Sequence, residues 1–452
     1  MQPLRRIFIA NRGEIALRVI RTCRRLGIET VLGVSAADRD SLPARSADRT
    51  LCLGPGRPGD SYLKVETVVH AAQASGCEAI HPGYGFLSER PALARLCEEE
   101  GVILIGPTTA QLEAVGDKLK ARGHAQAAGV PVVPGGSAET TAEALRLGAG
   151  IGAPLLVKAV GGGGGRGMKQ VLDLKDLPAV LALASAEAGA AFGDARVYLE
   201  RLVGRARHVE VQVLGDGEGG VLQLGERDCS VQRRYQKLIE ETPAPGLPAP
   251  LRSQLHEAAV KFARHLRYRG AGTVEFLVDA ERGEFYFLEM NARIQVEHPV
   301  TEAVTGVDLV AEQIRIASGQ GISAEAVAAA RHGPRGCAIE CRVNAEDPAQ
   351  DFRPSPGTVT EAAWPEGPGI RVDTHIERGA RVPPFYDSLL GKVIAWGDDR
   401  PAALARLRQA IAATRVAGVA TNLAFHARVL ADSRFAAGGV DTGFVQEERL
   451  NG

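Results

Sequence analysis

The first hundred residues alternate between short apolar runs and amphipathic stretches, and this alternation constrains the fold more than any other feature of the chain. Arg6–Ala10 has the pattern of a short buried strand, and Glu14–Leu26 carries one apolar helical stripe that ends at Gly27. The alternation continues with strands at Glu29–Ser35, Ala79–His81 and Val102–Ile105 and a helix beginning near Pro91. It predicts a parallel sheet with helices on both faces.

A dinucleotide-binding domain would carry Gly-x-Gly-x-x-Gly directly after its first strand. This chain has Asn11-Arg12-Gly13-Glu14 at that place. The turn lacks the glycines that would let the backbone approach a pyrophosphate, so the sequence does not favour a nicotinamide-binding domain.

A second, smaller unit is predicted from about Val132 to Val203. It begins among Pro and Gly residues and contains an Ala-rich helix at about 176–191. Its predicted strands are Pro154–Val160, Met168–Leu172 and Arg196–Val203. A small unit with this composition is a candidate lid over a neighbouring site.

From Arg207 onward, polar and apolar residues alternate with a period of two, which is typical of antiparallel strands. The predicted strands here are His208–Leu214, Val221–Gly225, Thr273–Val278, Glu284–Met290, Gly336–Asn344, Gly357–Thr360 and Leu389–Ala395. A helix near Arg400–Thr414 completes a third domain. At roughly 150 residues per domain, a chain of 452 residues has room for about three domains.

Charge and cysteine content exclude several classes of protein. With 53 Lys and Arg against 54 Asp and Glu, the net charge is −1, so nothing favours a nucleic-acid or membrane-surface partner. No apolar run approaches the roughly 18 residues of a membrane span, and the N-terminus lacks a signal-peptide core. Seven cysteines without a CxxC pair indicate free thiols in a reducing compartment. We therefore expect a cytoplasmic protein.

Five consecutive glycines, Gly161–Gly165, lie between two predicted strands and follow Lys158 closely. Their bare N–H groups are suited to folding over phosphate oxygens. A Walker A loop is excluded, because no Gly-Lys-Ser/Thr follows the run and its flanks are strands. The alternative is a flexible linker.

The segment Glu289–Glu297 is polar at every odd position, so an extended chain would carry these side chains on one face. Its acids and amides are oxygen ligands suited to Mg²⁺, Arg293 is suited to an oxyanion, and Glu275 on the preceding strand could add a carboxylate. Fully extended, the segment would span about 26 Å, so the chain must bend after Asn291 if both ends serve one site. Taken alone, the alternation also fits a solvated sheet face.

Four further features allow a structural interpretation as well as a functional one. Lys237 lies in a charge cluster typical of a solvated loop, and His81–Phe86 fits a tight turn after a strand. His208 fits a partly buried histidine on an alternating strand, and Arg342 fits a structural ion-pair partner.

Together these motifs resemble biotin carboxylase, an ATP-grasp enzyme that carboxylates biotin on a carrier protein. The matching stretches run through most of the chain in order. They are Ile9–Ala16, His81–Glu89, the five-glycine run, Glu226–Ser230, Glu289–Glu302 and Arg342–Pro348. The resemblance implies an α/β ATP-grasp fold with three parts. These are a Rossmann-like pre-ATP-grasp domain at 1–115, a linker and mobile glycine-rich lid at 116–203, and an ATP-grasp core with an α+β C-terminal domain at 204–452.

The resemblance also implies which residues bind ATP and metal. Lys118 and Lys158 would contact the phosphates, and Glu275 and Glu289 would hold Mg²⁺ or Mn²⁺, with Asn291 on a second ion. The full nucleotide-binding set implied is Lys118, Lys158, Gly164, Gly165, Glu200, Val203, His208, Tyr235, Glu275 and Glu289.

The reaction implied is phosphorylation of bicarbonate by ATP, followed by transfer of the carboxyl group to biotin. Glu297 would be the general base, and Arg342 would stabilise the enolate-like biotin oxygen. The residues implied to contact bicarbonate or biotin are Lys237, Arg293, Gln295, Val296, Tyr84 and Arg342.

The chain departs from the family pattern at three positions: Tyr235 replaces the usual His, Arg201 the usual Lys and Ala292 the usual Thr. It has no Met-Lys-Met biotin-attachment site, which implies a separate biotin carboxyl carrier protein and carboxyltransferase subunits. Family precedent is a homodimer within an acetyl-CoA or acyl-CoA carboxylase that feeds malonyl-CoA into fatty acid synthesis. Two rivals stay open: another ATP-grasp ligase that forms an acylphosphate, and a non-catalytic nucleotide-binding subunit.

Overall fold

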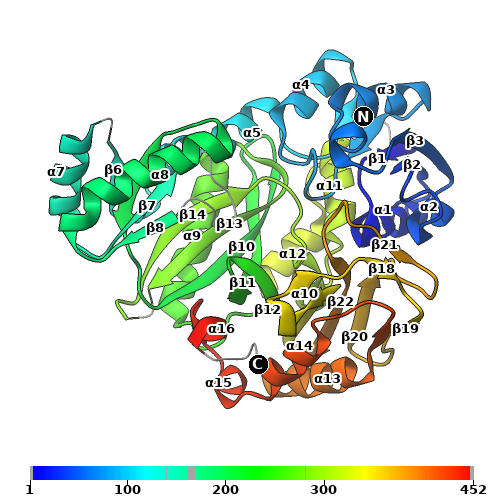
Figure 1. The fold of residues 1–452 in the computed structure, drawn as a ribbon. Coiled ribbons are helices and arrows are strands. Elements are labelled where there is room, and N and C mark those ends of the chain that lie inside the picture. The colour runs from blue at the N-terminus through cyan, green and yellow to red at the C-terminus, as the bar shows by residue number, and fades with distance from the viewer. Residues whose placement is uncertain (1–3, 139, 161–167, 280, 448–452) are drawn as a thin grey trace.

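A computed structural model describes residues 4–138, 140–160, 168–279 and 281–447 (Figure 1). Its elements form three main sheets, each with its own helices. Within these ranges no helix is long and apolar enough to cross a membrane. All seven cysteines are free, as the sequence predicts.

The N-terminal sheet is parallel, with strand order β3-β2-β1-β4-β5, as the alternation predicts. Its strands are β1 Arg6–Ile9, β2 Glu29–Ser35, β3 Arg49–Gly54, β4 Ala79–His81 and β5 Ile103–Leu104. The helices of this part are α1 Gly13–Arg25, α2 Leu42–Ser46, α3 Val65–Ala74, α4 Pro91–Glu99, α5 Thr109–Gly116 and α6 Lys118–Ala127. In α1 the predicted stripe is buried at Ile15, Val19 and Cys23, but its last member, Leu26, follows the end of the helix and is exposed.

A small four-stranded sheet with order β6-β9-β7-β8 forms the unit predicted as a lid, which projects on the left in Figure 1. Its elements are β6 Gly135–Ser137, α7 Thr141–Ile151, β7 Leu155–Ala159, β8 Met168–Val171, α8 Leu177–Phe192 and β9 Val197–Arg201. Leu155, Val157, Leu177 and Leu199 belong to a hydrophobic cluster confined to this unit. The lid therefore has a core of its own.

The large sheet has eight strands in the order β14-β13-β10-β11-β12-β15-β22-β20, and its pairs are antiparallel. Its strands are β10 Ala206–Asp216, β11 Val221–Arg233, β12 Gln236–Thr242, β13 Arg269–Asp279, β14 Glu284–Asn291, β15 Cys337–Asn344, β20 Ile370–Thr374 and β22 Leu389–Gly397. Several of these strands, such as β10, β11 and β13, are longer than predicted. The charge cluster around Lys237 suggested a solvated loop as one interpretation, but Lys237 lies in strand β12.

The two faces of the large sheet differ in chemistry. Val209, Val211 and Val213 of β10 pack in the hydrophobic cluster that includes residues of α9 (Ala249–His265). The alternate residues, such as Glu210 and Gln212, are also fully buried, but on the polar face. Period-two alternation therefore marks a buried polar face here rather than a solvated one.

The remaining helices complete the core around the large sheet. They are α10 His298–Thr305, α11 Leu309–Ala317, α12 Ala324–His332, α13 Arg400–Ala413, α14 Leu423–Ala431, α15 Ser433–Ala437 and α16 Phe444–Glu447. Arg227 of β11 donates to Thr301 of α10 at 2.9 Å, so α10 covers part of the polar face. The short strands are β16 Glu346–Asp347, β17 Arg353–Pro354, β18 Gly357–Thr358, β19 Glu361–Ala363, β21 Arg381–Val382 and β23 Arg415–Ala417.

Candidate active site

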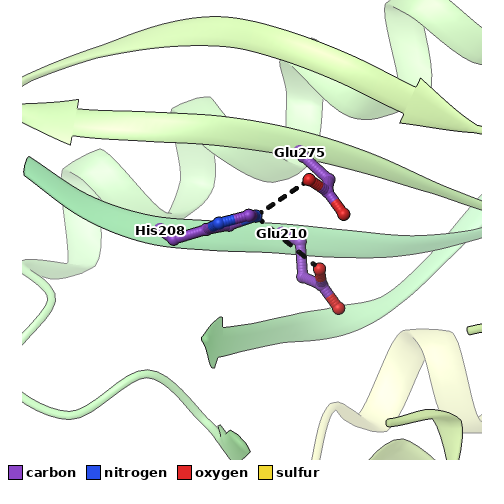
Figure 2. A group of neighbouring side chains, drawn as sticks. All are labelled: His208, Glu210 and Glu275. Atoms are coloured by element: carbon purple, nitrogen blue, oxygen red, sulfur yellow. Dashed lines mark ion pairs between the residues drawn. The ribbon is translucent and has the colours of Figure 1, made fainter. Parts of the chain in front are cut away.

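Strand register gathers carboxylates in the middle of the polar face. Glu210 of β10 is directly opposite Glu275 of β13, and Glu275 is opposite Glu289 of β14. Figure 2 shows His208 pointing toward Glu210 and Glu275 from the same strand as Glu210. His208 Nε2 lies 2.9 Å from a Glu275 oxygen. Burial opposes a charged imidazole, but the Glu275 carboxylate outweighs it and raises the pKa of His208.

Lys237 pairs with this group of carboxylates. Its ammonium donates to Glu275 at 2.8 Å and to Glu297 at 2.7 Å, and it also contacts Glu210. Burial alone would discharge Lys237, but the three carboxylates hold its pKa well above the ordinary value. The charge cluster of the sequence thus places a buried cation among three carboxylates.

Glu297 lies where the chain turns back into the site. β14 ends at Asn291, so the bend that the sequence requires is present, and Glu297 precedes the first residue of α10. Its side chain is fully buried. Burial would raise the pKa of Glu297, but Lys237, Arg342 and Arg227 outweigh burial and hold it well below the ordinary value. The carboxylate is therefore ionised and able to accept a proton.

Arg342 reaches the same carboxylate from the other half of the sheet. Its guanidinium donates to Glu297 at 2.9 Å and to Glu240 of β12 at 2.6 Å. Burial raises the pKa of Glu240 to about 7 despite the nearby Arg342. Charge-assisted hydrogen bonds of this kind orient both partners. Arg342 and Lys237 thus hold Glu297 through its two oxygens.

Arg293 and its neighbours line the bend between β14 and α10. Arg293 donates to Asn291 at 2.7 Å, to Gln295 at 2.8 Å and to Glu89 at 2.8 Å. Gln295 in turn donates to Glu275 at 3.0 Å. The structure therefore brings together Glu275, Asn291, Arg293 and Gln295, as the alternating pattern suggested.

Of the residues predicted to contact the nucleotide, Lys158 and Glu200 lie in the lid. Lys158 of β7 pairs with Glu200 of β9. Burial lowers the pKa of Lys118, which begins α6, and Lys158 lowers it further against the opposing effect of Glu289. Val203 packs in an apolar cluster with Val133 and other residues. Gly164 and Gly165 lie outside the described residues.

Tyr235 and Tyr84 lie outside the strands that carry the carboxylate group. Tyr235 is at the tip of the hairpin between β11 and β12, with 55% of the residue exposed and a φ of 67°. Tyr84 donates to Glu14. It lines a cavity of about 130 Å³ between the N-terminal part and β22, together with Phe86, His375 and others.

The oxygen donors of β13 and β14 fit a divalent cation. Burial, and then the like charge of Glu275, raise the pKa of Glu289. Within the described ranges no hydrogen bond or ion pair to the Glu289 carboxylate is found. A cation between Glu275 and Glu289 would remove this repulsion, and carboxylate oxygens are the ligands that Mg²⁺ prefers. His208, Glu210 and Glu275 also have ligand atoms within 4.8 Å of one another, but the Lys237 ammonium already pairs with both carboxylates.

Sequence reasoning missed several residues of this site. Arg227 is fully buried and donates to Glu210 at 2.6 Å, and Glu240 fixes Arg342. The alternation in 208–212 was a signal for Glu210, but a polar strand position of this kind also fits a solvated face. Only the pairing of strands distant in the chain separates the two interpretations.

Three family models together match most of the chain. They are the biotin carboxylase N-terminal domain over residues 3–112, the carbamoyl-phosphate synthase L chain ATP-binding domain over 117–325, and the biotin carboxylase C-terminal domain over 340–447. A biotin carboxylase of Nostoc sp. is 49% identical over 444 residues, which cover 98% of each chain. The chain belongs to the biotin carboxylase family.

Other biotin carboxylases and related proteins support the same assignment. The biotin carboxylase of Pseudomonas aeruginosa is 48% identical over 98% of each chain. A pyruvate carboxylase subunit of Methanothermobacter thermautotrophicus is 46% identical over 98% of this chain and 90% of the relative. The family therefore includes subunits that serve different carboxylases.

Solved biotin carboxylase structures have the same fold. A biotin carboxylase–β,γ-ATP complex from Campylobacter jejuni has a TM-score of 0.94 at 41% identity, covering 98% of this chain and 99% of that one. The biotin carboxylase domain dimer of Hydrogenobacter thermophilus 2-oxoglutarate carboxylase, with MgADP, ADP and bicarbonate, has a TM-score of 0.93 at 42% identity, covering 100% and 99%. The predicted family, ATP-grasp fold and ligase class are confirmed.

Proposed function

We propose that this chain catalyses the ATP- and bicarbonate-dependent carboxylation of biotin on a separate carrier protein. The observation that carries the proposal is the convergence of Lys237 and Arg342 on the buried carboxylate of Glu297. This arrangement combines an ionised base with two cations that can hold small anions. The bicarbonate and MgADP bound in the Hydrogenobacter relative support the same assignment.

Nucleotide binding is proposed at the boundary between the lid and the large sheet. Lys118 and Lys158 contact the phosphates, with Gly164 and Gly165 beside them, and the adenine lies against Glu200 and Val203. His208 and Tyr235 complete this set. Glu275 and Glu289, with Asn291, hold Mg²⁺ or Mn²⁺, which neutralises charge on the phosphates when bound.

Bicarbonate is proposed to bind against Lys237, Arg293 and the backbone at Gln295 and Val296. Glu297 removes the bicarbonate proton while an oxygen of the anion attacks the γ-phosphorus of ATP and ADP leaves. A base with a depressed pKa is weak, but a bound anion shares the positive charge of Lys237. The affinity of Glu297 for a proton therefore rises once bicarbonate binds.

Carboxyphosphate then breaks down to CO₂ and phosphate, and this phosphate removes the proton from the ureido nitrogen of biotin. Arg342 stabilises the negative charge that develops on the ureido oxygen, and the nitrogen attacks CO₂. Tyr84 lies on the biotin side of the site. Arg342 thus contributes to both reactions: it pairs with Glu297, the proposed base for bicarbonate, and it stabilises the charge on biotin.

The protein is proposed to act as a cytoplasmic homodimer. Its partners are a biotin carboxyl carrier protein and carboxyltransferase subunits of an acetyl-CoA or acyl-CoA carboxylase, which supplies malonyl-CoA to fatty acid synthesis. The proposed domains are the N-terminal domain at 1–115, the linker and lid at 116–203, and the ATP-grasp core with the C-terminal domain at 204–452.

Steady-state ATP hydrolysis tests the proposed function. The purified chain should cleave ATP only with bicarbonate and Mg²⁺, and free biotin should stimulate the reaction. Cleavage without stimulation by biotin would favour a different acylphosphate-forming ATP-grasp ligase. ATP binding without turnover would favour a non-catalytic role.

A further inference from the structure

Lys392 of β22 is a fully buried cation without an assigned role. It is directly opposite Arg342 of β15, so both side chains project from the polar face of the large sheet. A buried ammonium is costly unless it is paired and hydrogen-bonded. The groups that the Lys392 ammonium contacts therefore indicate the role of its charge.

The ammonium of Lys392 connects two parts of the site. It donates to the carbonyl oxygen of Val296 at 2.8 Å, one residue before Glu297. It also lies 3.1 Å from a carboxylate oxygen of Glu14, and the same oxygen accepts the hydroxyl of Tyr84. One cation thus reaches both the bend between β14 and α10 and the wall of the cavity that Tyr84 lines.

The contact with the Val296 carbonyl orients one backbone N–H, that of Glu297. The C=O and N–H of a trans peptide point in opposite directions, so a held carbonyl also sets the direction of its N–H. Lys392 holds the Val296 carbonyl, and the imidazole Nδ1 of His298 lies 2.7 Å from the Gln295 carbonyl. Within the described ranges, the N–H groups of Val296 and Glu297 donate no hydrogen bond. Two adjacent free N–H groups suit an anion.

We propose that Lys392 is a positioning residue for the anion site: it fixes the peptide unit between Val296 and Glu297 so that the Glu297 N–H faces bicarbonate beside that of Val296. The same ammonium also holds Glu14, and through Glu14 the hydroxyl of Tyr84, in a fixed position relative to that peptide unit. This inference rests on the proposed function, because the anion it concerns is the bicarbonate substrate. Lys392 acts through the backbone and does not touch the reacting atoms.

A purely structural role for Lys392 makes a different prediction. In that case Lys392 serves only to neutralise Glu14, because the second carboxylate near its ammonium, Asp373 at 4.0 Å, is also paired with Arg371. Removing the charges of Lys392 and Glu14 together would then restore the protein fully. Replacing a buried ion pair as a unit is often neutral for stability, whereas removing one partner is strongly destabilising. The double variant therefore separates neutralisation of Glu14 from orientation of Val296.

The experiment compares Lys392→Met, Glu14→Gln and the double variant by thermal unfolding and by steady-state kinetics. Lys392→Met should unfold at a lower temperature and show a KM for bicarbonate raised about tenfold or more, with the KM for ATP changed less than about twofold. The double variant should regain thermal stability but keep the raised KM for bicarbonate. Arg400→Met is the control, because Arg400 also pairs with a buried acid, Glu241, at 2.6 Å but does not contact 291–297. It should lower stability without changing the KM for bicarbonate.

A double variant with a normal KM for bicarbonate would overturn the positioning role, and so would an equal rise in the KM for ATP. These results presuppose an active parent protein. Absence of bicarbonate-dependent ATP cleavage in the unaltered chain would instead refute the proposed function, and the role of Lys392 with it.

Discussion

Lys237 and Glu297 are 60 residues apart in the chain, and their side chains form a 2.7 Å ion pair at the centre of the large sheet. The pair joins β12 to the start of α10, and both side chains are almost completely buried. In a buried environment an ion pair of this kind fixes the charge state of both partners. The proposed base is therefore ionised and oriented before substrate arrives.

Glu297→Gln should nearly abolish ATP cleavage, with a fall in kcat of about 10²–10⁴-fold, because an amide cannot accept the bicarbonate proton. Nucleotide binding should stay measurable by calorimetry, since the predicted phosphate and adenine contacts are elsewhere. Glu257→Gln, which removes an exposed carboxylate of α9, is the matched control. Unchanged turnover in Glu297→Gln would exclude this residue as the base.

Arg342→Ser should impair biotin carboxylation about 10²-fold and biotin-independent ATP cleavage considerably less, because its proposed charge partner is the biotin oxygen. Carboxybiotin formation and phosphate release are measured in parallel. Arg95→Ser, which removes an exposed guanidinium paired with Glu113, should change neither rate. Equal losses of both activities would argue against a specific role toward biotin.

Glu289→Gln should raise the Mg²⁺ concentration that gives half-maximal ATP cleavage by about tenfold, because one of two facing carboxylate ligands is lost. Excess Mg²⁺ should partly restore the rate, and a chelator should abolish the activity of the unaltered protein. Glu284→Gln at the exposed end of β14 should leave the Mg²⁺ dependence unchanged. If Glu289→Gln showed the original dependence, the metal site would have to lie elsewhere.

The free energy of unfolding should depend on pH because Glu240 is buried in the folded protein. Its pKa is raised from 4.5 to about 7 by burial, so the folded state binds more protons than the unfolded state in this window. Its contribution to stability is thus complete below about pH 4.5 and is lost as the pH rises to about 7, on the order of 2–3 kcal/mol.

Urea unfolding at pH 5 and pH 8 measures this contribution. Glu240→Gln mimics the neutral acid and should reduce the loss of stability between the two pH values, whereas Glu361→Gln, at an exposed position, should not. An identical pH dependence in Glu240→Gln and the unaltered protein would contradict the raised pKa.

Much of the architecture was predictable because it depends on local patterns. The apolar stripe of 14–26 and the strand at 29–35 required only helical and strand periodicity, and both are present. The bend after Asn291 followed from chain length alone, since an extended segment could not bring both ends to one site. For the charged segment that forms β12, the sequence left a solvated loop open beside a functional role, because its burial depends on α10 and on strands far away in sequence.

By itself, the sequence determined the periodicity of the elements, the residue types available for the chemistry and the resemblance to biotin carboxylases. The tertiary structure decided which charges meet. Glu210, Glu240 and Lys392 look like ordinary polar strand residues in the sequence, and only the order and register of the eight strands bury them beside Lys237, Arg342 and Val296. The physical reason is that the energy of a charge depends on its burial and its partners, and both are set by strand pairings between distant parts of the chain.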